Sequence, residues 1–130
     1  MDISPWETDE LLNELVRRGW TLWLCGRREA PDVLAATLKS PECTDVVVIR
    51  SEDLATAWRV LNGKHSDPLN PEFVVWHYLN TSTVWTLRAV LSLPSADQMA
   101  AYVYPAPVDC CLPEAELKPV TIRPTTARTT

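Results

Sequence analysis

The chain has 130 residues, 46% hydrophobic and 22% charged, which suffices for one hydrophobic core and is too short for two. Its formal net charge of −5 argues against general binding to nucleic acid, because phosphate binding needs a basic surface. The longest apolar runs, such as Val46–Ile49, have the length of strands, so we expect no membrane-spanning segment. Residues 1–10 hold no basic residue and no continuous apolar run, which excludes a secretory signal and predicts a cytoplasmic protein.

The first predicted element is a helix at residues 5–18. Ser4 suits the N-cap, Pro5 suits the first helical position, and Glu7 completes a capping box. Apolar residues follow at helical spacing, and Gly19 can end the helix in the left-handed conformation.

Three strands are predicted next. Residues 20–25 alternate between two faces and are rich in residues that suit a sheet. Residues 32–39 read as a second strand, although their composition would also suit a helix. Residues 45–50 form a third strand, and the run Val46–Ile49 indicates a central position that is buried on both faces.

The segment 51–63 fits two structures. Its apolar residues have helical spacing, with Ser51 as a possible cap, yet the same segment also alternates as a strand would. We slightly favour the helix. The helical pattern uses Leu54, Ala57, Trp58 and Leu61, and the strand pattern uses Thr56, Trp58 and Val60.

The rest of the chain predicts a loop, a strand at residues 73–79 and a helix at residues 83–93. The expected fold is therefore α+β: a mainly antiparallel sheet of three to five strands packed against two helices. We expect residues 1–94 to form this single domain. Residues 95–130 read as a Pro-rich irregular segment that ends in a disordered polar tail.

Two segments of the sequence, Val84-Trp-Thr-Leu-Arg-Ala-Val-Leu-Ser-Leu-Pro94 and Pro119-Val-Thr-Ile-Arg-Pro124, resemble small uncharacterised proteins of actinomycetes. The resemblance covers most of the chain. It implies no activity, because none is assigned to those proteins.

The predicted order of elements also resembles the core of the PD-(D/E)xK nucleases. That chemistry needs two acids to hold Mg²⁺ and a lysine beside them. Asp32 and Asp45 are the candidate ligands, but the strand that begins at Asp45 has no acid two positions before a lysine. A divergent metal-dependent nuclease is therefore an alternative, and an enzyme is the less favoured interpretation.

Cysteine and histidine residues are numerous enough for a metal or redox site, which is a third interpretation. Their spacing contains no Cys-x-x-Cys pair and no two histidines at helical interval, as structural zinc sites usually have. His77 lies in an apolar and aromatic run, where a histidine usually bonds within the fold. We therefore predict free thiols, no metal and no cofactor. The residues concerned are Cys25, Cys43, Cys110, Cys111, His65 and His77.

Six tryptophans are many for a chain of this length, and large aromatic residues serve cores first and interfaces second. Trp20 and Trp23 fall on opposite faces of the strand at residues 20–25, so a sheet covered on one side would expose one of them. We choose Trp23 as the exposed residue. The favoured function is a non-enzymatic protein-interaction module that forms a homodimer or binds another protein through Trp20, Trp23 and Trp58.

Overall fold

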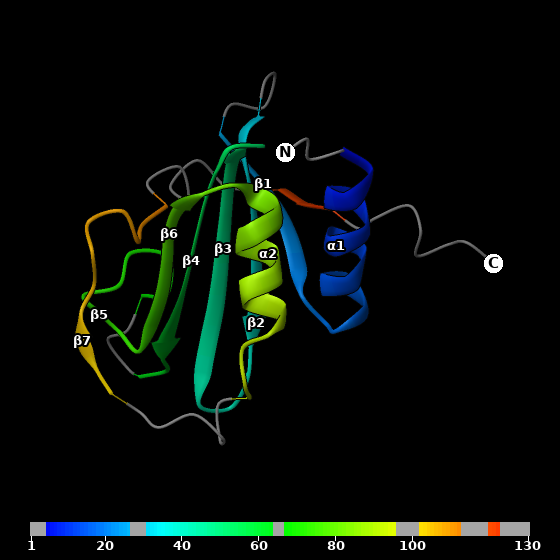
Figure 1. Cartoon of the computed structure of the whole chain (residues 1–130). Coiled ribbons are helices and arrows are strands. Elements are labelled where there is room, and N and C mark those ends of the chain that lie inside the picture. Colours follow the sequence, from blue (N-terminus) through cyan, green and yellow to red (C-terminus); the bar gives the residue numbers. More distant parts are fainter. Residues whose placement is uncertain (1–4, 27–30, 64–66, 96–101, 113–119, 123–130) are drawn as a thin grey trace.

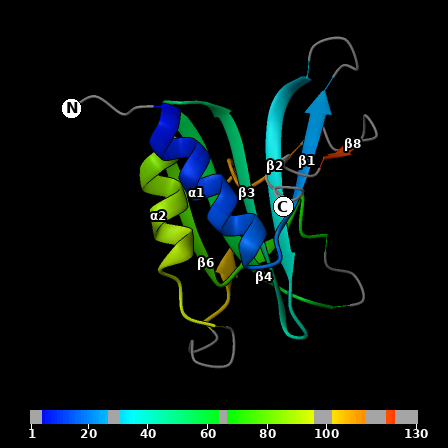
Figure 2. The same ribbon diagram turned by 90° about the vertical axis from the view of Figure 1, so that its right-hand side faces the viewer.

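Two helices lie on one face of an antiparallel sheet, so the fold is α+β as expected (Figures 1 and 2). The computed structural model describes residues 5–26, 31–63, 67–95, 102–112 and 120–122. Six strands form the sheet in the order β6-β4-β3-β2-β1-β8, and β5 pairs with β7 in a separate ribbon. The elements are α1 (Pro5–Arg17), β1 (Thr21–Gly26), β2 (Pro31–Lys39), β3 (Cys43–Ser51), β4 (Leu54–Leu61), β5 (Phe73–Val74), β6 (Trp76–Thr81), α2 (Thr83–Leu91), β7 (Tyr104–Pro105) and β8 (Val120–Ile122).

Helix α1 has the position that the capping pattern predicts, and it ends at a left-handed glycine. Gly19 has φ 98°, a conformation that glycine adopts without a steric penalty. The Gly19 amide donates to the carbonyl of Val16, and the Trp20 amide donates to the carbonyl of Leu15, at 3.0 and 3.1 Å. These two bonds form a Schellman motif, which turns the chain from α1 into β1.

Strands β1 to β4 form a meander in which each strand pairs antiparallel with the next. Strand β3 lies between β2 and β4, and its residues from Cys43 to Val48 are buried. Val47 packs toward the helices, whereas Val46 and Val48 pack on the opposite face. This confirms the prediction of a central strand that is buried on both sides.

The segment 51–63 contains a strand, so the slight preference for a helix was wrong. Strand β4 pairs with β3 along its length and with β6 on its other side. Trp58 and Val60 pack on one face of the sheet and Ala57 packs on the other. The open backbone groups of β3 require a partner, and the short turn after Ser51 brings this segment beside them.

The predicted strand at residues 73–79 is divided in the structure into β5 and β6. Val75 lies between them, and its amide donates to the carbonyl of Arg59 at 2.9 Å. The predicted second helix is α2, which begins after Ser82. The Ser82 hydroxyl accepts a hydrogen bond from the Trp85 amide, so Ser82 is the N-cap.

Described parts of the segment after residue 94 pack on the same sheet, which the sequence did not indicate. Cys110 and Leu112 are buried in the core on the face opposite the helices, and Tyr104 packs against that core. Strand β7 pairs with β5, to the left of β6 in Figure 1, and β8 pairs with the edge strand β1. The predicted disordered tail, residues 123–130, lies outside the described residues.

None of the helices in the described part of the chain has both the length and the apolar character needed to cross a membrane.

Candidate functional site

The three tryptophans proposed from the sequence lie in different surroundings. Trp20 is buried under the helices, and Trp58 is buried on the opposite face, where its indole N–H donates to the carbonyl of Pro68 at 2.7 Å. Neither offers surface to a partner in this conformation. Trp23 is half-buried, and its indole N–H donates to the Thr37 hydroxyl at 3.0 Å.

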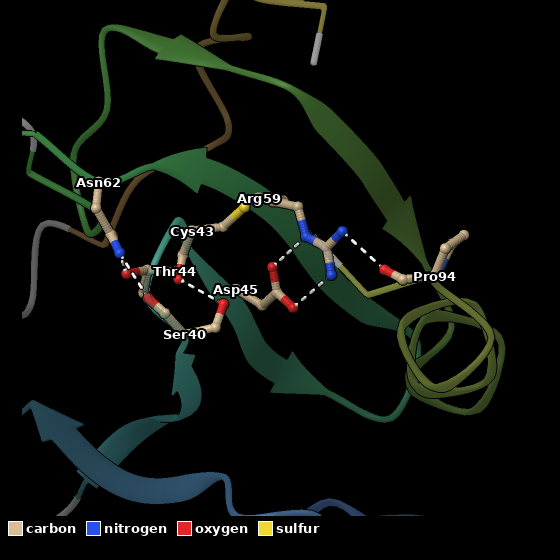
Figure 3. A network of polar contacts seen from close by, with 7 residues as sticks. All are labelled: Ser40, Cys43, Thr44, Asp45, Arg59, Asn62 and Pro94. Carbon is tan, nitrogen blue, oxygen red and sulfur yellow. Dashed lines mark hydrogen bonds and ion pairs between the residues drawn. The ribbon is translucent and has the colours of Figure 1, made fainter. Parts of the chain in front are cut away.

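Asp45, proposed above as a metal ligand, is bound to an arginine (Figure 3). It lies directly across from Arg59 on the neighbouring strand, and both side chains are buried. Arg59 Nε and Nη2 donate to the two carboxylate oxygens at 2.6 and 3.0 Å, and Nη1 donates to the Pro94 carbonyl at 2.8 Å. The carboxylate raises the pKa of Arg59. Both carboxylate oxygens are therefore engaged, and the pair joins the sheet to the chain after α2.

A second polar cluster lies beside this pair and holds the β2–β3 turn (Figure 3). The Thr44 hydroxyl donates to Asn62 Oδ1 at 2.6 Å, and Asn62 Nδ2 donates to the Ser40 carbonyl at 2.7 Å. The Ser40 hydroxyl donates to the Cys43 carbonyl at 3.0 Å. These bonds connect protein groups to one another, which indicates a structural role.

No group of three or more His, Cys, Asp or Glu side chains in the described ranges is arranged to hold a metal ion. The side chain of Asp32, the other proposed ligand, lies outside the described residues, as does His65. Within the described residues, Asp45 therefore belongs to no cluster of acids that could bind a metal ion.

None of the four cysteines forms a disulfide. Cys25, Cys43 and Cys110 are buried and Cys111 is half-buried. Burial raises the pKa of Cys110 to about 12, so this thiol stays protonated and is a poor nucleophile at neutral pH. His77 Nδ1 lies 2.7 Å from the Tyr104 hydroxyl, which confirms that this histidine bonds within the fold.

A hollow of about 330 Å³ opens on the sheet face opposite the helices, and we call it the Trp23 pocket. Its lining is mostly apolar, and β2 contributes a hydroxyl and an ammonium group to it. The lining residues are Trp23, Ala35, Pro68, Leu69, Leu112 and Gly63, with the polar residues Thr37, Lys39, Thr44 and Asn62.

Hydrogen bonds hold the walls of the Trp23 pocket in place. Trp23 is fixed by Thr37, and the segment at Pro68 is fixed by Trp58. The Leu112 amide donates to the Leu69 carbonyl at 2.8 Å, which joins two walls that come from different segments. The pocket is therefore formed before any ligand arrives.

A second hollow of about 440 Å³ is lined in part by Asp67 and Asn70, whereas Pro68 and Leu69 between them line the Trp23 pocket. Three exposed hydrophobic residues line it: Leu61 is 37% exposed, Phe73 is 48% exposed and Val103 is 50% exposed. Asp67 and Glu72 also line it. We call these five residues the Phe73 surface.

We compared the chain with known proteins. No protein-family model, curated protein or solved structure matches it. Neither the resemblance to small actinomycete proteins nor that to the nucleases gains support, so any function must be argued from the residues of this chain.

Sequence reasoning selected Trp23 but not the rest of either hollow. Thr37 and Lys39 share a face of β2, which alternation along the strand could have indicated. The Phe73 surface had no such signal, because Leu61, Phe73 and Val103 come from three segments that meet only in the folded chain.

Proposed function

We propose that the protein is a non-enzymatic protein-interaction module that binds its partner at the Phe73 surface. The supporting observation is that Leu61, Phe73 and Val103 are exposed and line one hollow. Exposed apolar residues that gather in one place, with polar residues around them, are typical of interaction sites. Four cysteines without a disulfide are compatible with the reducing cytoplasm, where we place the protein.

The charge of this surface favours a partner with a basic segment. Asp67 and Glu72 are the charged residues among the described side chains that line the hollow, and the whole chain has a net charge of −5. We therefore propose that the occupant is an apolar side chain with Lys or Arg beside it. Opposite charges at the rim speed association and align the partner.

The homodimer expected from the sequence stays a prediction. A two-fold contact through the Phe73 surface would bring Asp67 and Glu72 of each copy close to the same residues of the other copy. Like charges at a contact reduce affinity, so a different, basic chain fits this surface better than a second copy does. Native mass spectrometry of the untagged protein separates the two cases.

The test is selection of random peptides on the immobilised protein, followed by fluorescence-polarisation titration of the selected peptides. We expect them to combine an apolar residue with Lys or Arg. Phe73→Ser should weaken their binding at least tenfold, because the central apolar residues supply most of the affinity of such contacts.

Trp85→Ser is the matched control, because Trp85 on α2 is also 48% exposed and lies outside this hollow. It should leave peptide binding unchanged, and circular dichroism should show both variants folded. Equal binding by wild type and Phe73→Ser, or selected peptides without basic residues, would refute the proposed surface.

A further inference from the structure

We propose that the Trp23 pocket is a binding site for a small monocarboxylic acid with an apolar body of one or two rings. This site is separate from the Phe73 surface, and the proposal does not depend on the protein-interaction function. It rests on the size of the pocket, on its lining and on two hydrogen-bond donors from β2, Thr37 and Lys39. The other polar lining side chains, Thr44 and Asn62, already donate to protein groups.

The size and the lining determine the body of the ligand. Ligand pockets usually measure about 300–1,000 Å³ and are mainly apolar with a few polar groups. At about 330 Å³ this pocket lies at the small end of that range. The indole of Trp23 offers a flat apolar wall, and Leu69 and Leu112 offer aliphatic ones, which together suit a ring.

The donors determine the charged end of the ligand. Thr37 and Lys39 are two positions apart on β2, so their side chains project from the same face of the strand. The Thr37 oxygen accepts the Trp23 bond, which leaves the hydroxyl proton for a ligand. Lys39 is exposed, and no carboxylate among the described residues forms an ion pair with it.

One ammonium and one hydroxyl match a single carboxylate. Lys39 is the one charged group among the described side chains that line the pocket, so a second negative charge on the ligand would have no partner there. The net charge of −5 on the chain also disfavours a multiply charged anion. A monoanion with an apolar body matches both the apolar lining and the single charge of Lys39.

The experiment uses the full-length ¹⁵N-labelled protein and two probes with the same body, 3-phenylpropanoate and its uncharged amide, 3-phenylpropanamide. Two-dimensional NMR titration follows the indole N–H of Trp23 and the backbone amides of β2. We expect saturable shifts at these positions with the acid, and binding of the amide at least fivefold weaker.

Variants test the assignment of the charged end. Lys39→Gln should weaken binding of the acid about fivefold and leave binding of the amide unchanged, because only the charged contact is lost. Arg17→Gln is the control. It removes one positive charge from the exposed side of α1, and it should change neither the binding of the acid nor the binding of the amide.

Three results with the wild-type protein would overturn the proposal. They are the absence of saturable binding by the acid, shifts that gather away from Trp23 and β2, and equal affinities for acid and amide. Unchanged acid binding in a folded Lys39→Gln protein would remove the assigned charged end and with it the proposed ligand class.

Discussion

Among the described residues, the buried charge of Arg59 is bound by the carboxylate of Asp45 and the carbonyl of Pro94. Its guanidinium forms two bonds with Asp45 and one with the carbonyl of Pro94. Desolvation makes a buried pair costly to form, so its net contribution to stability is small even when its geometry is good. Removal of one partner is different, because the other charge then stays buried and loses its ion pair.

We therefore predict that Arg59→Met lowers the free energy of unfolding by about 3–5 kcal/mol, and that Asp45→Leu has a similar cost. The double variant should lose clearly less than the sum of the two, since neither charge remains. Urea unfolding of the four proteins gives the coupling energy directly. Additive losses would mean that the two charges do not stabilise each other.

Because of Cys110, we expect the free energy of unfolding to fall as the pH rises into the alkaline range. Burial raises its pKa to about 12 in the folded protein, whereas an exposed thiol in the unfolded chain has a pKa of about 8.5. As the pH rises, the unfolded chain therefore loses this proton first, which favours unfolding. The contribution of the Cys110 thiol to stability is fully present below pH 8.5 and is lost as the pH rises toward 12, by about 1.4 kcal/mol for each pH unit.

Cys110→Ala should lower stability at pH 7, because it leaves a small cavity, yet it should flatten the decline between pH 9 and 11. Cys111→Ala, at the neighbouring half-buried position, is the control and should keep the wild-type slope. Denaturant unfolding at several pH values measures both. If Cys110→Ala showed the same decline, the decline would belong to other groups. Tyr104 is one such group, because burial also raises its pKa.

The end of helix α1 depends on a glycine at position 19. Gly19 has a positive φ, and Ala at this position would be strained whatever the space around it. We predict that Gly19→Ala lowers the free energy of unfolding by about 1 kcal/mol.

Gly19→Asn is the comparison, since asparagine enters the left-handed conformation more readily than alanine does. It should cost less stability than Gly19→Ala, because the same backbone conformation is then less strained. Thermal unfolding followed by circular dichroism distinguishes the two. A neutral Gly19→Ala would show that the Schellman motif is not needed to end α1.

For the whole molecule, stability should be greatest along the middle of the sheet. Strands β3 and β4 have paired neighbours on both edges and packed side chains on both faces. We predict that the amides of Val46, Val47 and Val48 exchange with solvent most slowly, through global unfolding only. Those of the two-residue ribbon β5–β7 should exchange faster, as native-state hydrogen exchange by NMR can show. Equal protection would mean that the ribbon unfolds only with the sheet.

Short sequence patterns were enough to predict helix α1 and strand β3. The capping residues and Gly19 predicted α1, and the valine run predicted the central strand β3, because helix caps and burial on two faces leave marks within a few residues. The α+β class followed from these elements. Trp23 was selected by alternation along one strand.

Tertiary structure alone decided everything that depends on distant partners. The segment of β4 carried two periodicities, and pairing with β3 and β6 selected the strand. Asp45 became half of an ion pair only because Arg59 lies opposite it. The same holds for both hollows, since their walls come from segments far apart in the sequence. The exposure of a side chain depends on what covers it, and that is a property of the folded chain rather than of its neighbours in sequence.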